Sequence, residues 1–277
     1  MTMSSELQLG GALVLLGAGK MGGAMLQGWL SRNLPPSRIV VLDPFPPAAI
    51  ARTIAERGIE LNPDLGRLER VEVLVLAIKP QNFDDVLPTV AGLRSHHPLV
   101  LSIAAGQTIA GIERHFGDDA AIIRAMPNVP AAIGRGITVM VATPNVSASQ
   151  LGLAQSLLEA IGEVVVADDE GLMDAVTAVS GSGPAYVFYF AECLAEAAVA
   201  AGLPEELATK LARATVSGAG ELMRASGRPA ADLREMVTSP NGTTYEALAV
   251  LMARDGLKPL MKKAVAAAAQ RSRDLAR

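Results

Sequence analysis

The sequence predicts an α/β protein in which an N-terminal Rossmann-type domain with a doubly wound parallel sheet, residues 1–167, precedes a C-terminal all-helical domain, residues 168–277. Two observations support this prediction. Through about residue 167, continuous runs of Val, Ile and Leu alternate with helical segments, as in a sheet buried on both faces. From residue 170 onward the chain holds Ala-rich helical segments and no convincing strand.

The strands of the first domain are expected in five apolar runs, 12–17, 38–43, 71–78, 98–104 and 120–126. The alternation of apolar runs with helical segments ends after GEVVVADD. Helices are expected at 20–32, from about residue 47, and after the third strand. In the second domain we expect helices at 185–202, 204–227 and 258–277. Gly202 before Pro204 and Gly227 before Pro229 indicate where one helix ends and the next begins.

Composition and charge exclude several functions. A net charge of −4 without a block of Lys or Arg argues against a nucleic-acid or membrane partner. Cys193 is the only cysteine, and His96, His97 and His115 lack metal-ligand spacing, so neither a disulfide nor a metal is expected. No signal peptide or membrane-spanning run is recognised, so we expect a cytoplasmic protein.

The segment from Pro184 to Ala201 is apolar around most of its helical circumference. Such a helix is buried on several sides, either within its own domain or against another subunit. An all-helical domain of about 110 residues with such helices often needs a partner to cover them.

The stretch LVLLGAGKMGGAML places Gly17, Gly19 and Gly22 in a G-x-G-x-x-G pattern between a strand and a helix. In this pattern the first glycine permits the turn, the second admits a pyrophosphate, and the third lets helix pack on strand. The free N–H groups of the helix start face the anion. The pattern predicts NAD(H) or NADP(H) binding, with a glycine-rich turn without ligand as the alternative.

The second strand ends at Asp43, 21 residues after Gly22. A carboxylate at this position bonds the ribose 2′-hydroxyl of NAD and repels a 2′-phosphate, which makes NADH plausible. Alternatively, Asp43 only caps the turn before Pro44.

Three further strand ends carry AIKPQNF, SIAAGQT and AMPNVP. Ligands of open parallel sheets lie beyond the carboxyl ends of the strands, so Lys79, the small residues 104–106 and Asn128 fall on the coenzyme side. The alternative for each is an ordinary βα turn.

Two polar loops interrupt the helical domain. SGSGP, residues 180–184, is either a wall of the nicotinamide pocket or a site of tight helix packing. In VTSPNGTTYEAL, Pro240 and Asn241-Gly242 form a turn, and Thr243 and Thr244 start a helix with unpaired N–H groups. This start is either a cradle for a small carboxylate substrate or plain capping.

These residues resemble Δ1-pyrroline-5-carboxylate reductase over nearly the whole chain, most specifically in DAVTAVSGSGPAYVF and LREMVTSPNGTTYEAL. The resemblance implies NAD(P)H-dependent reduction of a cyclic imine to L-proline, the last step of proline biosynthesis. It also implies a site between the coenzyme domain and helices that interlock in a homodimer. Many members assemble further, commonly into rings of five dimers.

The resemblance assigns roles residue by residue. The substrate carboxylate would be held by the loop residues Ser239, Gly242, Thr243 and Thr244. Thr244 matches the threonine proposed to hydrogen-bond the ring nitrogen, which makes it the candidate catalytic residue. The family's coenzyme positions match Gly17, Ala18, Gly19, Lys20, Met21, Gly22, Ala77, Lys79, Ala104 and Asn128. Asp43 is a coenzyme candidate from its place after the second strand, and it departs from the family pattern, which argues against strict use of NADPH. The family usually has glycine at Asn241, and many members have small or hydroxylated residues at Asp43.

Two rival functions follow from the same pattern. A β-hydroxyacid dehydrogenase would need a catalytic lysine four residues after Gly183, where this chain has Val187. A non-catalytic nicotinamide-binding sensor would retain the fold but would have no need of both polar loops.

Overall fold

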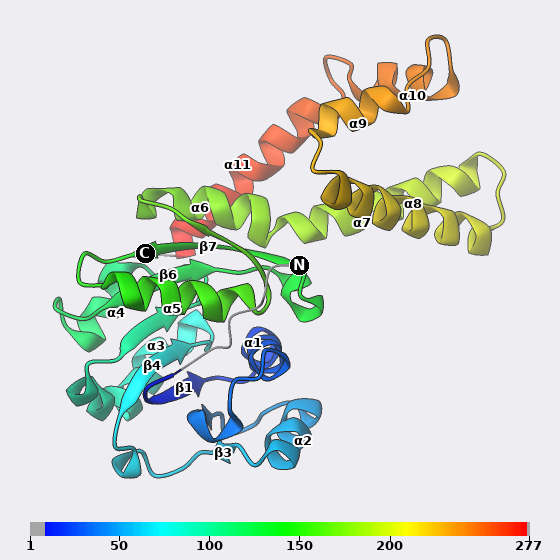
Figure 1. Ribbon diagram of the computed structural model, residues 1–277. Coiled ribbons are helices and arrows are strands. Elements are labelled where there is room, and N and C mark those ends of the chain that lie inside the picture. The colour runs from blue at the N-terminus through cyan, green and yellow to red at the C-terminus, as the bar shows by residue number, and fades with distance from the viewer. Residues whose placement is uncertain (1–8, 276–277) are drawn as a thin grey trace. The chain divides into compact units, whose positions relative to one another are not determined.

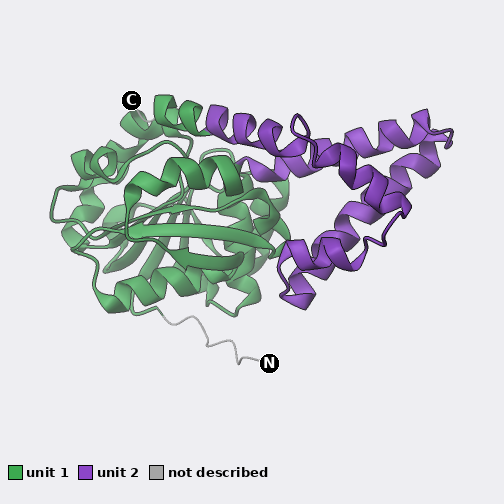
Figure 2. Cartoon of the chain, turned by 90° about the horizontal axis from the view of Figure 1, so that it is seen from above, with its two compact units in different colours: residues 1–181, 269–277 green, residues 182–268 purple. Residues whose placement is uncertain are grey.

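The computed structural model describes residues 9–275, which form two compact units (Figure 2). Unit 1 comprises residues 1–181 and 269–277, and unit 2 comprises residues 182–268. This division differs from the boundary at 167/168 that we predict from sequence. Helix α6 (Met173–Val176) and the π-helical turn Thr177–Gly181 belong to unit 1, and the end of α11 (Leu257–Leu275) returns to it. The Ser272 hydroxyl donates to the Asp174 carboxylate at 2.6 Å and ties these two segments together.

Unit 1 is built on one eight-stranded sheet with the order β3-β2-β1-β4-β5-β6-β7-β8 (Figure 1). The strands are β1 (Ala12–Leu16), β2 (Ile39–Leu42), β3 (Glu60–Leu61), β4 (Val71–Leu76), β5 (Leu99–Ser102), β6 (Ile122–Met126), β7 (Gly136–Ala142) and β8 (Gly162–Val166). Strands β1 to β6 are mutually parallel, which confirms the Rossmann-type fold.

Strand β7 was not foreseen, and it pairs antiparallel with β6, so the sheet is mixed rather than wholly parallel. The chain turns back after β6 through a 3-10 turn, Val129–Ile133, too short for the crossover that a parallel neighbour needs. Strand β8 then pairs parallel with β7.

Helices cover both faces of the sheet. Along β1, Leu13 and Leu15 belong to one buried cluster and Val14 and Leu16 to another, because alternate side chains of a strand point to opposite faces. The first cluster is covered by α1 (Lys20–Ser31), α2 (Ala48–Arg57) and α5 (Ala148–Glu159), and the second by α3 (Phe83–Val86), the 3-10 segment Leu87–His96 and α4 (Ile109–Phe116). The buried Trp29 indole donates to the Leu157 carbonyl at 2.9 Å and so joins α1 to α5.

Unit 2 is helical throughout. It contains α7 (Gly183–Ala200), α8 (Glu205–Ser226), α9 (Ala230–Met236), α10 (Thr243–Leu251) and most of α11. Helix α7 ends before Gly202 (φ +99°) and α8 ends at Gly227 (φ +61°), as the Gly and Pro positions predict. Among residues 9–275, no helix is both long and apolar enough to cross a bilayer.

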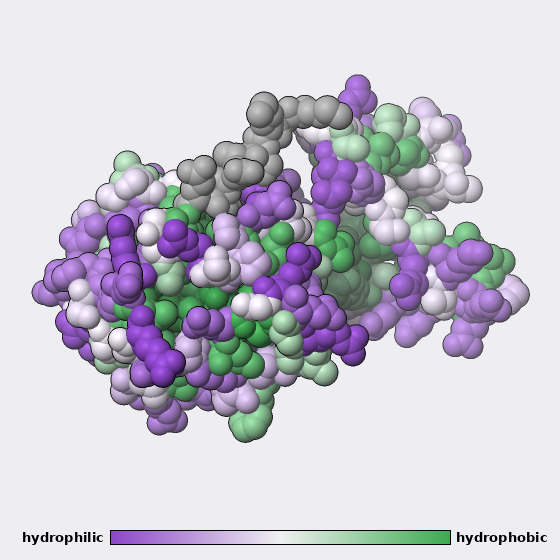
Figure 3. All heavy atoms as spheres, turned by 60° about the horizontal axis from the view of Figure 1, so that its bottom comes forward, coloured by the Kyte–Doolittle hydropathy of each residue, from purple (hydrophilic) through white to green (hydrophobic). Residues whose placement is uncertain are grey.

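A single copy of unit 2 has almost no closed core. Within residues 182–268, all of which the structure describes, Ala208 and Ala212 are the residues that are buried. Large apolar side chains lie at the surface instead, and Phe188 and Tyr189 of α7 are 59% and 66% exposed. Figure 3 shows apolar residues among polar ones on one face of the molecule. This exposure is the pattern of an interface rather than of an isolated domain.

Candidate functional site

The glycine loop that links β1 to α1 has two positions at which only glycine fits. Gly17 has φ +93°, and a Cβ on it would lie 2.8 Å from the Ala77 carbonyl oxygen. A Cβ on Gly22 would overlap the Gly17 carbonyl oxygen. The loop is therefore folded tightly against the end of β4, as the predicted roles of the first and third glycine require.

Gly19 differs, because a Cβ placed on it would meet nothing within 4 Å. Its φ of −65° is open to any residue. The first helical hydrogen bond of α1 runs from the Gly23 N–H to the Gly19 carbonyl, so the N–H groups of residues 20–22 precede it. The first turn of α1 carries no acidic residue. Open space beside unpaired N–H groups at a helix start fits a pyrophosphate.

Asp43 lies one residue beyond β2, beside this loop. Its Oδ2 accepts the N–H of Ala18 at 2.7 Å, and its Oδ1 accepts the N–H of Phe45 at 2.9 Å. The bond from Phe45 is the turn cap, one of the two roles that the sequence leaves open for Asp43. The bond from Ala18 places the carboxylate on the glycine loop itself. A turn cap and a role beside the coenzyme are therefore not exclusive.

Four of the remaining predicted coenzyme residues, Ala77, Lys79, Ala104 and Asn128, follow the carboxyl ends of β4, β5 and β6, which meet at one edge because these strands are parallel. Lys79 is exposed, Ala77 is half-buried, and Ala104 is buried. Lys20 and Met21 open α1, with Lys20 exposed and Met21 half-buried.

Asn128 makes two hydrogen bonds within the unit. Its Oδ1 accepts the Ile137 N–H at 2.9 Å, and its Nδ2 donates to the Ser180 carbonyl at 3.0 Å. The side chain thus joins β6, β7 and the π-helical turn of the SGSGP segment. In this structure it braces that turn, and one amide hydrogen is left for a ligand.

A part-buried ion pair that no sequence pattern predicts joins β6 to the segment before α6. Arg124 of β6 donates to Glu170 Oε1 at 2.6 Å, and the same oxygen accepts the N–H of Ile109 at 2.8 Å. Ile109 is the first residue of α4, directly after the AAGQT loop. The pair therefore anchors a predicted coenzyme loop, and its 46-residue separation follows no local spacing rule.

In unit 2, residues 239–242 form a tight turn. The Gly242 N–H donates to the Ser239 carbonyl at 3.0 Å, with Pro240 and Asn241 at the centre. Asn241 has φ +58°, a left-handed conformation that asparagine tolerates best after glycine. The asparagine thus suits the position at which the family usually has glycine.

Helix α10 begins at Thr243, as predicted, with Gly242 as its N-cap and no side-chain cap. Its first helical bond runs from the Glu246 N–H to the Gly242 carbonyl. The N–H groups of Thr243, Thr244 and Tyr245 precede this bond, so a small anion can bind there. Thr243 is exposed and Thr244 is half-buried.

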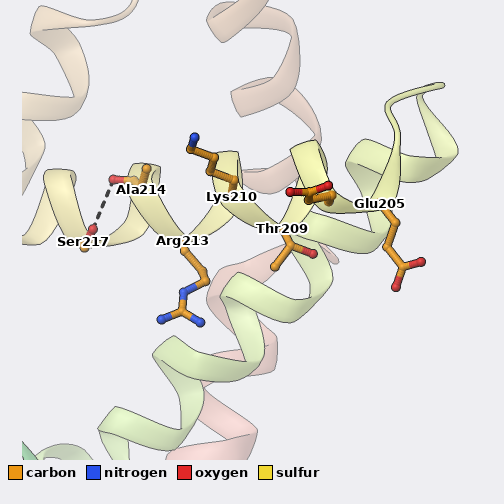
Figure 4. A pocket seen from close by; sticks show the side chains of 7 residues that line it. Glu205, Thr209, Lys210, Arg213, Ala214 and Ser217 are labelled. Carbon is orange, nitrogen blue, oxygen red and sulfur yellow. Dashed lines mark hydrogen bonds between the residues drawn. The ribbon is translucent and has the colours of Figure 1, made fainter.

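A wide hollow lies along α8 (Figure 4). Its lining consists of α8 residues alone, Glu205, Glu206, Thr209, Lys210, Arg213, Ala214 and Ser217. Mixed charges on one helix are typical of a solvated surface.

On α7, the Cys193 thiol hydrogen-bonds Tyr189 and raises the pKa of that exposed tyrosine. None of these side chains belongs to the predicted site, and residues 9–275 contain no metal-binding cluster of His, Cys, Asp or Glu.

Comparisons with known proteins agree with the resemblance seen in the sequence. Residues 170–275 match the family model described as pyrroline-5-carboxylate reductase dimerisation, and residues 12–106 match the model described as NADP oxidoreductase, coenzyme F420-dependent. Pyrroline-5-carboxylate reductase of Synechocystis is 41% identical over 98% of each chain.

Two solved structures have the same fold over nearly their full length. A pyrroline-5-carboxylate reductase from Coxiella burnetii gives a TM-score of 0.89 at 34% identity, covering 96% of this chain and 99% of that one. The Plasmodium falciparum pyrroline carboxylate reductase with NADP bound gives a TM-score of 0.81 at 28% identity, covering 97% of this chain and 99% of that one. The chain belongs to the pyrroline-5-carboxylate reductase family.

Proposed function

We propose that this chain reduces 1-pyrroline-5-carboxylate to L-proline with NADH or NADPH. The observation that carries the proposal is the near-complete match to reductases of this name. It is supported by the open space beside Gly19 and by the start of α10, which has no side-chain cap. The match to relatives alone would support the family, and the two loops supply the chemistry that the reaction needs.

The residues around the glycine loop fit the coenzyme. The N–H groups at the start of α1 would hold the pyrophosphate in the space beside Gly19. Ala77, Lys79, Ala104 and Asn128, at the ends of β4 to β6, would line the nicotinamide side. When bound, the reduced nicotinamide supplies a hydride.

The substrate loop supplies an uncharged cradle for the carboxylate. The N–H groups of Thr243 and Thr244 and the hydroxyl groups of Ser239 and Thr243 would bind it without an arginine. Gly242 brings the backbone close, because a Cβ on it would approach the Ser239 carbonyl oxygen to 3.1 Å.

The Thr244 hydroxyl would hydrogen-bond the ring nitrogen of the imine. It can accept from a protonated nitrogen or donate to a neutral one, and the carbon of an iminium group is already electrophilic. Catalysis then consists mainly of positioning, which contributes roughly 7 kcal/mol or more in well-oriented systems. A histidine acid is not required for this reaction.

The proposal is tested by following the absorbance of reduced nicotinamide when purified protein meets pyrroline-5-carboxylate, with NADH and NADPH in parallel. Oxidation with either coenzyme supports the proposed reaction. Folded protein that binds the coenzyme but does not oxidise it would exclude the reductase and favour a sensor, whereas reactivity towards a hydroxyacid would favour the dehydrogenase.

Substitution of Thr244 by alanine is expected to lower kcat by roughly 10- to 100-fold, because a hydrogen bond to a charged group contributes about 1.5–3 kcal/mol. The Kd for the coenzyme should change little, since Thr244 lies outside the glycine loop. Stopped-flow turnover and coenzyme titration measure the two quantities.

Thr244→Ser retains the hydroxyl and serves as the matched variant, so we expect it to recover most of the rate. Equal turnover in wild type and Thr244→Ala would remove Thr244 from the mechanism.

We further propose that unit 2 pairs with its counterpart in a homodimer, and that dimers assemble into a decamer. The exposed apolar residues of α7 support the formation of the homodimer.

Light scattering should give two or ten times the chain mass of 28.7 kDa. Phe188→Asp is expected to lower that mass, whereas Phe45→Asp, on a phenylalanine of unit 1 that is even more exposed, should not; a monomeric wild type would contradict the proposal. The free, exposed Cys193 suits a cytoplasmic location, which we also propose.

A further inference from the structure

The carboxylate of Asp43 is held in place by the backbone on both of its oxygens. Oδ2 accepts the Ala18 N–H at 2.7 Å, and Oδ1 accepts the Phe45 N–H at 2.9 Å. Ala18 is fully buried in the glycine loop, and the Gly17 N–H next to it donates to the Leu42 carbonyl. The carboxylate is thus fixed relative to the loop that would carry the coenzyme.

Asn62 fixes the backbone of Asp43 in turn. Its Oδ1 accepts the Asp43 N–H at 2.9 Å, and its Nδ2 donates to the Asp43 carbonyl at 2.8 Å. The Asn62 N–H donates to the Val41 carbonyl, which keeps the residue next to the end of β2. Asn62 has φ +51°, so the two side-chain hydrogen bonds from Asn62 to the Asp43 backbone depend on a left-handed residue just after β3.

This arrangement suits a hydroxyl donor better than a phosphate. An ionised carboxylate is an acceptor with about four lone-pair sites, of which the two N–H groups use two. The others can accept from ribose hydroxyl groups, whereas a 2′-phosphate brings only acceptors and about −1.5 to −2 charge. The turn Asp43–Pro47 reads DPFPP, so it offers no Lys, Arg, Ser or Thr to a phosphate.

We propose that Asp43 selects NADH over NADPH in this chain and that Asn62 is the positioning residue that holds Asp43 against the glycine loop. The proposal rests on the coenzyme use in the proposed function. It identifies the coenzyme that the chain takes, and it adds a residue, Asn62, to which no sequence motif assigns a role.

Titration of the protein with NADH and with NADPH, followed by nicotinamide fluorescence, tests the selection without substrate. We expect the Kd for NADPH to exceed that for NADH by at least about 10-fold, or about 1.4 kcal/mol. In Asp43→Asn, which keeps the shape but removes the charge, this ratio should fall about 10-fold. If Asp43 only braced the loop, both Kd values would rise together and the ratio would not move, which would overturn the proposal.

Asn62→Gly tests the two hydrogen bonds between the Asn62 side chain and the Asp43 backbone, because glycine keeps the left-handed backbone and removes only the side chain. We expect the NADPH to NADH ratio of Kd values to fall by roughly 3- to 10-fold as the carboxylate becomes free to turn away. Asn33→Gly is the matched control, since Asn33 also has positive φ (61°) and lies outside the loop. A lower Tm with an unchanged ratio in Asn62→Gly would show a purely structural role.

The outcomes separate this inference from the proposed reaction. Selective NADH binding without imine turnover would leave the inference intact and exclude the reductase. Turnover with a wild-type preference for NADPH would support the reductase and overturn the inference.

Discussion

Alanine at Gly19 is expected to leave the protein folded and to weaken coenzyme binding about 100-fold. The backbone of Gly19 has an ordinary φ of −65°, and an added Cβ meets no atom of the protein within 4 Å. The methyl group would instead occupy the space proposed for the pyrophosphate. Overpacking of a filled site costs about 1–3 kcal/mol, or up to roughly 100-fold in Kd.

The measurement pairs a fluorescence titration of NADH with thermal unfolding of the same samples. Gly152→Ala is the matched control, because Gly152 lies in α5 and also has nothing within 4 Å of its Cβ position. It should raise stability by about 0.5–1 kcal/mol and leave the Kd unchanged. Unaltered affinity in Gly19→Ala would mean that the coenzyme does not lie beside this glycine.

Gly22→Ala should behave in the opposite way. Its Cβ would overlap the Gly17 carbonyl oxygen and lie 3.2 Å from the Ala77 side chain. Because both neighbours are fixed by the sheet, the fold itself would be damaged. The three glycines of one motif therefore divide into two that shape the loop and one that leaves room for a ligand.

The sequence was sufficient for features that depend on local pattern. The parallel strands β1, β2 and β4 to β6 are mostly Val, Ile and Leu, and the glycine motif needs only its place between strand and helix. The turn before α10 was predictable because Pro240, Asn241 and Gly242 each have strong backbone preferences.

Features that depend on tertiary register could not be predicted. β7 runs antiparallel because its preceding turn is short, and β3 has only two residues, too few for a pattern. Asn62 lies in a loop without a motif, and its bonds to Asp43 exist only because β3 lies next to β2. Arg124 and Glu170 are joined through packing of distant segments, with no periodicity to indicate it.

Removal of the Glu170 carboxylate is expected to cause the largest loss of stability among single polar substitutions discussed here. In Glu170→Met the guanidinium of Arg124, whose side chain is 6% exposed, would lose its carboxylate. The Ile109 N–H would lose its acceptor at the same time. Breaking a buried pair from one side costs about 3–5 kcal/mol, and we expect the lower end because Glu170 is 30% exposed.

Urea unfolding at one fixed protein concentration measures this loss, since oligomerisation couples stability to concentration. Glu159→Met is the matched control, because its 3.8 Å pair with Arg32 is more exposed and should contribute at most about 1 kcal/mol. The double variant Arg124→Met, Glu170→Met should recover most of the loss, because two apolar side chains of similar size leave no unpaired charge. If the double variant were as unstable as Glu170→Met, the lost acceptor of Ile109 would explain the effect, and the α4 start would matter more than the ion pair.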